Sequence, residues 1–141
     1  MRRAPAIVRA GPSQLPDVTT LRSRLGTAGE GHVRRHLERA GWHFVVANWR
    51  CPAGEIDLVF LDGEELVLVE VKTRRGATAG SAAEGVSRTK AAKLLRAAEW
   101  YVDGHEAHRD RIWRIDIAAL QLTPSGVVER LTLIENAIVA G

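Results

Sequence analysis

Three ionisable residues interrupt two strongly hydrophobic stretches of the chain, where they could act together in chemistry. Asp57 lies in the first stretch, and Glu70 and Lys72 lie in the second. Because side chains alternate between the faces of a β-strand, Glu70 and Lys72 are expected to share a face. Counting back symmetrically from a hairpin turn at 62–64 brings Asp57 within about two residues of Glu70. The two carboxylates are therefore expected to converge.

Two carboxylates beside a lysine suit a divalent cation that promotes phosphodiester hydrolysis. Carboxylate oxygens bind Mg²⁺, which also accepts phosphate oxygens, and Mn²⁺ is the expected substitute. The cation would acidify a water, and Lys72 would orient that water or stabilise the transition state. The backbone carbonyl of Val71 is expected within reach as a further ligand. The alternative is a solvated face of cross-strand ion pairs, although the hydrophobic neighbours argue against it because burying charges is costly.

The surrounding sequence predicts a mixed α/β domain that positions these residues. Hydrophobic spacing predicts a helix over 21–40 and a second helix, capped by Ser87, that ends near residue 102. Strand patterns cover 42–50, 55–61, 65–72, 112–122 and 127–134. This order implies antiparallel pairings and one parallel pairing. We expect residues 1–20 to be a flexible leader and 21–141 to form a single nuclease-like domain.

Three glycines lie in the first half of the first helix, at positions 26, 29 and 31. Each lowers helix propensity by roughly 1 kcal/mol relative to alanine. Something other than propensity must therefore favour glycine there.

The composition excludes several classes of protein. The chain has 141 residues, of which 45% are hydrophobic and 26% charged, as in a globular protein with one core. The single cysteine, Cys51, excludes an internal disulfide framework and a cysteine-based zinc site, and suits a reducing, cytoplasmic compartment. No run of 18 apolar residues predicts a membrane-spanning helix, and the basic start lacks the apolar region of a secretory signal.

The net charge of +3 hides two neighbouring blocks of opposite sign. Residues 51–70 hold six carboxylates and no base, whereas residues 72–96 hold seven bases and one acid. Basic clusters of this kind bind the phosphates of nucleic acids. The bases expected to do so are Arg74, Arg75, Arg88, Lys90, Lys93 and Arg96.

Gly-Glu-Ile-Asp-Leu-Val at 54–59, followed by Leu-Val-Glu-Val-Lys-Thr-Arg at 68–74, resembles the bacterial UPF0102, or YraN-like, family. That family is related to archaeal Holliday junction resolvases and to the PD-(D/E)xK nuclease superfamily. Further matches are Gly29-Glu30, Asn48-Trp49-Arg50, Lys90, Arg114-Ile115-Asp116 and Asn136-Ala137. The resemblance implies a restriction-endonuclease-like core, with a mixed sheet of about five strands flanked by helices. It also implies a Mg²⁺-dependent nuclease-type site, a nucleic-acid partner and, by analogy with junction cutters, a homodimer.

The resemblance assigns Glu30 the role of a third acidic group at the metal. Glu30 shares a hydrophobic stripe with Val33 and Leu37, which is unusual for a carboxylate. The alternative is a half-exposed residue near the helix start, favoured there by the helix dipole. For Lys90 we favour a solvated basic face that contacts DNA over a catalytic role. Asp116 is interpreted as structural and paired with Arg114.

The remaining reactive residue types form no clear site. His32 and His36 have a spacing that can bind zinc, but no third ligand is evident and arginines surround them, which favours a solvated helix face. The four tryptophans are interpreted as core residues, with stacking of Trp49 on an unpaired base as a weaker alternative. No partner base is evident for Cys51.

Three hypotheses for function remain at the level of the sequence. The first is a Mg²⁺-dependent endonuclease that acts on DNA, with branched or damaged DNA as candidate substrates. The second is a non-catalytic nucleic-acid-binding module with the same fold. The third is a protein-interaction scaffold, which gains nothing from carboxylates placed inside apolar strands.

Overall fold

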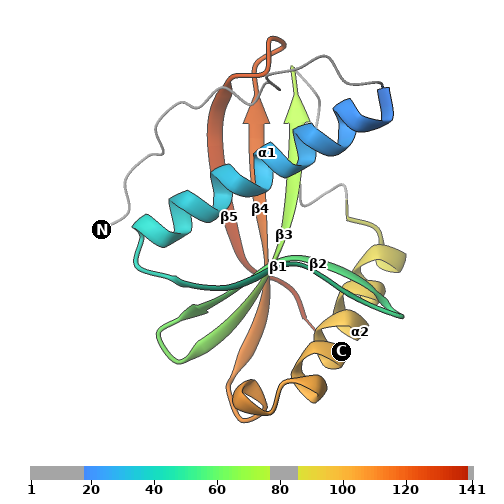
Figure 1. The fold of residues 1–141 in the computed structure, drawn as a ribbon, viewed down its shortest axis with the longest axis vertical. Helices are drawn as coiled ribbons and strands as arrows, with labels where there is room; N and C mark the ends of the chain where they lie inside the picture. Colours follow the sequence, from blue (N-terminus) through green and yellow to red (C-terminus); the bar gives the residue numbers. More distant parts are fainter. Residues whose placement is uncertain (1–17, 77–85, 140–141) are drawn as a thin grey trace.

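A computed structural model describes residues 18–76 and 86–139, with side chains described from residue 28 onward. Figure 1 shows the order of the elements along the chain. They are α1 (Val18–Arg39), β1 (His43–Cys51), β2 (Gly54–Asp62), β3 (Glu65–Arg75), α2 (Arg88–Gly104), the 3₁₀ turn η2 (Glu106–His108), β4 (Trp113–Leu122) and β5 (Val128–Ile138). The first helix begins at Val18, so the remainder of the expected leader, 1–17, lies outside the described residues, as do residues 77–85.

The five strands form one mixed sheet in the order β1-β2-β3-β4-β5. The pairings are antiparallel except for β3 with β4, which run parallel and are connected through α2 (Figure 1). A parallel neighbour needs a long crossover, and a helix is the usual way to provide it. The predicted α/β class, with its mixed five-stranded sheet of the restriction-endonuclease-like type, is confirmed.

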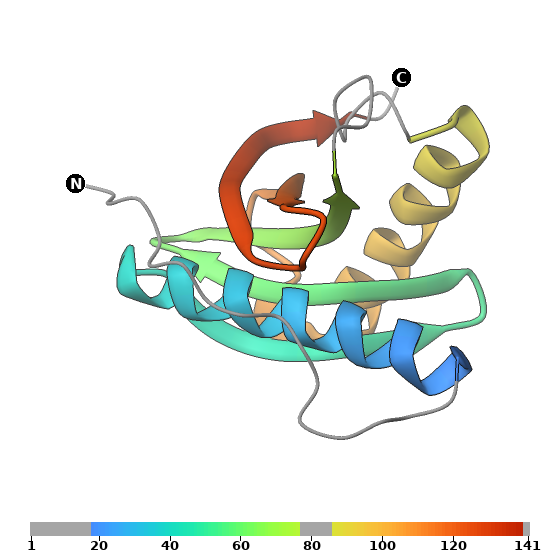
Figure 2. The ribbon, with the colours of Figure 1, turned by 90° about the horizontal axis from the view of Figure 1, so that it is seen from above.

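The two helices cover different faces of this sheet (Figure 2). Alternate residues of β3 show this, because Val67 and Val69 pack in a cluster with α1, whereas Leu66 and Leu68 pack in a cluster with α2. The α1 side of the first cluster supplies Val33 and Leu37, and the α2 side of the second supplies Leu94, Ala97, Ala98, Tyr101 and Val102. The hydrophobic stripes expected from the sequence are the surfaces that contact the sheet.

The β1–β2 hairpin changes face in its middle, and this irregularity lies at the candidate site. Ala47 packs in the α1 cluster, whereas Trp49, two residues later, packs in the α2 cluster. Residues two apart in a regular strand share a face, so the strand must rotate between them. Asn48 provides the rotation with a left-handed φ of 54°. On β2, Ile56 packs in the α2 cluster and Leu58 packs in the α1 cluster, so the same change of face occurs at Asp57.

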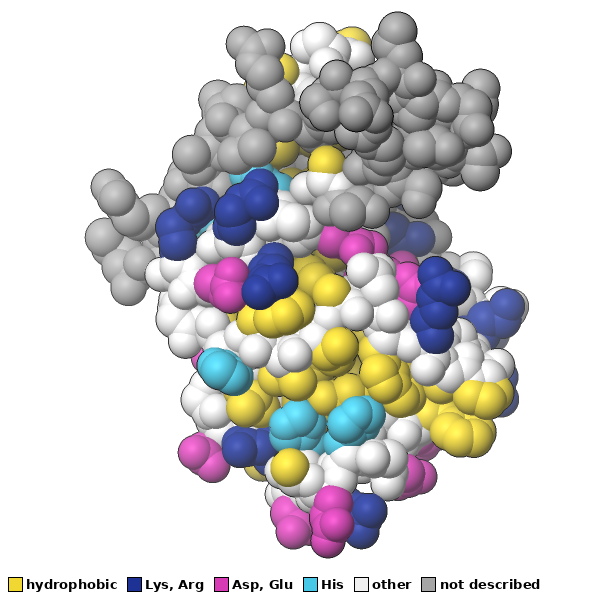
Figure 3. Space-filling model, viewed as in Figure 1, with side chains coloured by type: hydrophobic (Ala, Val, Ile, Leu, Met, Phe, Trp, Pro, Cys, Tyr) yellow, Lys and Arg dark blue, Asp and Glu magenta, His cyan; other side chains and the backbone are white. Residues whose placement is uncertain are grey.

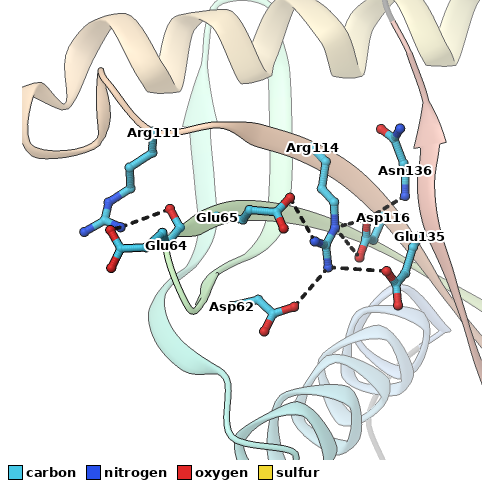
Figure 4. A network of polar contacts seen from close by, with 8 residues as sticks. All are labelled: Asp62, Glu64, Glu65, Arg111, Arg114, Asp116, Glu135 and Asn136. Atoms are coloured by element: carbon cyan, nitrogen blue, oxygen red, sulfur yellow. Dashed lines mark hydrogen bonds and ion pairs between the residues drawn. The ribbon is translucent and has the colours of Figure 1, made fainter.

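Arg114 connects the β2–β3 turn to β4 and β5 (Figure 4). Its guanidinium lies 3.1 Å from Asp116 Oδ1 and 3.3 Å from Asp62 Oδ2. Glu65 and Glu135 complete the set at 3.2 and 3.9 Å. Asp116 is fully buried and also accepts a hydrogen bond from the backbone N–H of Asn136. The structural interpretation of Asp116 therefore agrees with the geometry.

The surface retains exposed hydrophobic side chains. On the face seen in Figure 1, hydrophobic side chains reach the surface across the middle of the molecule, below α1 (Figure 3). Trp100 is 51% exposed, so the interpretation of every tryptophan as a core residue is wrong at this position. Trp100 does not belong to the buried stripe of α2, which is formed by Leu94, Ala97, Ala98, Tyr101 and Val102. No helix in the described ranges combines the length and the hydrophobicity needed to cross a bilayer.

Candidate metal and nucleic-acid site

Asp57 and Glu70 meet across the β2–β3 hairpin. The last paired residues in this register are Leu58 and Val69, so the next position sets Asp57 opposite Glu70. Glu70 is 6% exposed, although a carboxylate is rarely buried without a partner. The structure thus brings together the two carboxylates that the sequence singled out.

The surroundings of Asp57 favour its protonated form, and a nearby cation would favour the ionised form instead. Burial, together with the charges of Glu70, Glu30 and Glu55, raises its pKa to about 8. The backbone N–H of Val71 donates a hydrogen bond of 2.8 Å to Asp57 Oδ2, which opposes this shift. Val71 therefore contacts Asp57 through its backbone N–H. The role of its backbone carbonyl as a metal ligand stays a prediction.

Two further carboxylates converge on Asp57. Oxygens of Glu30 from α1, Glu55 from β2 and Asp57 lie within 4.8 Å of one another. Burial raises the pKa of Glu30, and the charges of Glu55 and Glu70 add to the rise, while a hydrogen bond from the side chain of Asn48 opposes it. Glu30 is therefore directed at the site rather than into solvent. The rotation at Asn48 places its amide beside this helix residue.

Glu55 is a site residue that the sequence reasoning missed. It lies two residues before Asp57 on the same strand, and regular alternation places the two side chains on one face. Its carboxylate lies beside those of Glu30 and Asp57, and it forms a 3.0 Å ion pair with Arg50 at the end of β1. The signal that could have found Glu55 is its spacing of two residues from Asp57 on the same predicted strand.

Glycine at position 29 allows α1 to approach the sheet at this point. A Cβ atom placed on Gly29 would lie 3.0 Å from Thr73 Oγ1 and 3.3 Å from Leu120 Cδ1. The close approach brings the next residue, Glu30, to the carboxylates of β2. It explains why glycine is kept here in spite of its low helix propensity.

Two lysines neutralise Glu70. Lys72, two residues along β3 on the same face, lies 4.0 Å from Glu70 Oε2. Lys90, from the first turn of α2, lies closer, at 3.4 Å. The interpretation of Lys90 as only part of a solvated basic face is therefore incomplete, because its ammonium group reaches the candidate site.

The other basic residues assigned to nucleic acid occupy two places. Arg88, Lys93 and Arg96 are exposed on α2. Arg74 and Arg75 end β3, and the guanidinium of Arg75 lies against Gly126 in the β4–β5 turn. Arg88, Lys93 and Arg96 lie on the same helix as Lys90 and form a basic surface beside it in the sequence.

His32 is not on a solvated face. It is 2% exposed, and neither ring nitrogen has a hydrogen-bond partner within the part of the chain that the structure describes. Burial lowers its pKa, and the charges of Arg35, His36 and Arg39 act in the same direction. The sequence interpretation was wrong for His32 because it judged the helix face from the neighbouring arginines alone.

The donor set fits a hard divalent cation. All the converging ligand atoms are carboxylate oxygens, which suit Mg²⁺ or Mn²⁺. Burial and mutual repulsion raise the pKa values of Asp57 and Glu30, and a bound cation would relieve the repulsion.

The sheet, its two helices and the carboxylates at the β2–β3 hairpin define an α/β protein with a restriction-endonuclease-like core. A family model described as "Uncharacterised protein family UPF0102" matches residues 29–120. The chain belongs to this family. UPF0102 proteins of Roseiflexus castenholzii and Beutenbergia cavernae are 41% and 46% identical to it, over 74% and 72% of this chain and 85% and 86% of those proteins. A UPF0102 protein of Ectopseudomonas mendocina is 40% identical over 80% of this chain and 92% of its own length.

Proposed function

We propose that this protein is a divalent-metal-dependent nuclease that hydrolyses phosphodiester bonds of DNA. The observation that carries the proposal is the convergence of Glu30, Glu55 and Asp57, with Glu70 opposite Asp57 on β3 and its charge acting on both Asp57 and Glu30. Lys72 lies beside Glu70. The carboxylates of Glu30, Glu55, Asp57 and Glu70 outnumber the ammonium groups of Lys72 and Lys90 beside them. A divalent cation would relieve the repulsion among these carboxylates and favour the ionised form of Asp57.

The carboxylates of Glu30, Asp57 and Glu70 would hold the cation, and Glu55 lies close enough to join them. When bound, Mg²⁺ would acidify a water and neutralise charge that develops on the phosphate. Lys72 would hold that water by hydrogen bonding or stabilise the negative charge of the transition state. The exposed bases of α2 would hold the phosphates on either side of the reacting bond.

The test is incubation of the purified protein with duplex, flapped and four-way DNAs in Mg²⁺ or Mn²⁺. We expect cleavage of at least one substrate, abolished by EDTA and reduced by about 100-fold or more in Asp57→Asn and Glu70→Gln. Glu38→Gln, at an exposed position of α1 outside the site, is the matched loss of one carboxylate and should cleave like the wild type. Cleavage that persists in both site variants would identify a contaminating nuclease and would contradict the proposal.

The alternative to distinguish from a nuclease is a non-catalytic nucleic-acid-binding module. It would retard DNA in EDTA, lose that binding steeply with salt, and keep it in Glu70→Gln. Homodimerisation remains an expectation by analogy, and sedimentation of the free and DNA-bound protein measures it.

A further inference from the structure

Lys90 sits at a position that local helix rules disfavour. It is the third residue of α2, and its backbone N–H donates a 3.1 Å hydrogen bond to the Ser87 Oγ cap. The first turn of a helix carries partial positive charge, so a lysine there is unfavourable, and this turn contains no acidic residue to offset it. The counter-charge comes from the sheet, where Glu70 Oε2 lies 3.4 Å from Lys90 Nζ.

The two lysines at Glu70 differ in their freedom to move. The side chain of Lys72 is 27% exposed and that of Lys90 is 43% exposed, while Glu70 itself is 7% exposed. Lys72 is attached to the same strand as Glu70 and is the more buried of the two lysines. Lys90 reaches Glu70 from the solvent side, at the end of a long flexible side chain.

We infer that Lys90 is an exchangeable counter-ion of Glu70, which releases this carboxylate to a divalent cation and then contacts a backbone phosphate of the nucleic acid. The inference rests on the proposed metal site and adds a residue that acts by changing partners. Lys90 belongs to the element that also presents Arg88 and Lys93 to solvent, so its released ammonium group would join a surface already suited to phosphates.

Removing Lys90 should change the cation affinity in one direction if Lys90 exchanges partners, and in the other direction, or not at all, if Lys90 only holds Glu70 in place. If Lys90 only held Glu70 in place, its removal would weaken cation binding or leave it unchanged. If Lys90 competes with the cation, Lys90→Gln removes a nearby positive charge. The affinity for Mn²⁺ in the absence of DNA should then rise by about fivefold, as expected for a partly exposed charge a few ångströms away. Titration calorimetry with Mn²⁺ alone measures this, and Lys90→Arg should return the affinity towards that of the wild type.

DNA binding provides a second readout that does not depend on cleavage. In EDTA, Lys90 stays with Glu70, so Lys90→Gln should change the affinity for a short fluorescent duplex by less than about twofold. In Ca²⁺, which supplies the cation, the same variant should lose about fivefold. Lys93→Gln is the matched control, because it removes the same charge from an exposed position of the same helix. It should lower DNA affinity equally in EDTA and Ca²⁺ and leave Mn²⁺ affinity unchanged.

Each outcome decides between the two proposals. Weaker or unchanged Mn²⁺ binding by a folded Lys90→Gln, or equal DNA losses in EDTA and Ca²⁺, would overturn the exchange and leave the metal site standing. A wild-type protein that binds Mn²⁺ but cleaves nothing would contradict the nuclease proposal. The exchange would still be tested by Mn²⁺ affinity and DNA binding, which do not depend on cleavage. A wild-type protein that binds no divalent cation would overturn both. Thermal unfolding of each variant confirms that it is folded.

Discussion

The ionisation of Asp57 is controlled by charges of its own sign. Burial and the carboxylates of Glu70, Glu30 and Glu55 all favour its protonated form, and the hydrogen bond from Val71 N–H only partly offsets them. With a pKa of about 8, the metal-free carboxyl group is mostly neutral at physiological pH. Binding of a cation should therefore release a proton, which links metal affinity to pH.

Asp57→Asn tests this ionisation through stability. Because the folded pKa is raised, folded wild-type protein keeps a proton that the unfolded chain releases. The stability of the metal-free wild type should therefore fall as pH rises from about 4 to about 8 and change no further through this group above that. Asp57→Asn removes this loss, so it should be more stable than the wild type at about pH 9, by on the order of a few kcal/mol, with the difference shrinking towards pH 4. Urea unfolding in EDTA across this range measures it.

Added Mg²⁺ provides the control for this prediction. At about pH 9 the cation should stabilise the wild type more than Asp57→Asn, since the variant lacks a charged ligand. Parallel pH curves for the two proteins in EDTA would show that Asp57 ionises normally.

At the scale of elements, the sequence predicted the parts of the site that follow regular geometry. Asp57 and Glu70 could be brought together because strand alternation and a short turn determine cross-strand neighbours. The place of Glu55 beside Asp57 follows from the same alternation and was missed. The change of face at Asn48 could not be predicted, because no propensity indicates which asparagine adopts a positive φ. The reach of Lys90 depends on how α2 rotates as it packs on the sheet, which its sequence alone does not determine.

The approach of α1 to the sheet gives a prediction for this element. Gly29→Val would place its side chain against Thr73 and the buried Leu120, which should destabilise the fold by about 1–3 kcal/mol more than a valine at Gly31. Gly31 is the matched control, because it lies in the same helix and a Cβ there meets only the flexible end of Arg35 at 3.4 Å. Both variants carry the same change in helix propensity, so the difference in urea unfolding isolates the contact with the sheet.

Displacement of α1 should also affect the site. Gly29→Val should weaken Mn²⁺ binding relative to Gly31→Val, since it moves the helix that carries Glu30. Equal stability and equal cation affinity of the two variants would show that the close approach at Gly29 does not position the site.

At the scale of the whole molecule, the acidic block of the sequence divides between the two ends of the β2–β3 hairpin. Glu55, Asp57 and Glu70 lie at the end that faces α1 and the start of α2, whereas Asp62 and Glu65 lie at the turn and contact Arg114. Acidic and basic side chains are also interspersed on the face shown in Figure 3. The acidic block read from the sequence therefore divides between the candidate cation site and the structural network around Arg114.

The structural network gives a prediction that separates it from the cation site. Arg114→Met leaves Asp116 buried with the backbone N–H of Asn136 as its remaining described donor, so it should destabilise the protein by about 3–5 kcal/mol at neutral pH. Glu38→Gln, which breaks an exposed helix ion pair, should cost at most about 0.5 kcal/mol. Combining Arg114→Met with Asp116→Asn removes the uncompensated charge, so the double variant should regain part of the lost stability in a double-mutant cycle. A loss in Arg114→Met no larger than that in Glu38→Gln would show that the stability of buried Asp116 does not depend on Arg114.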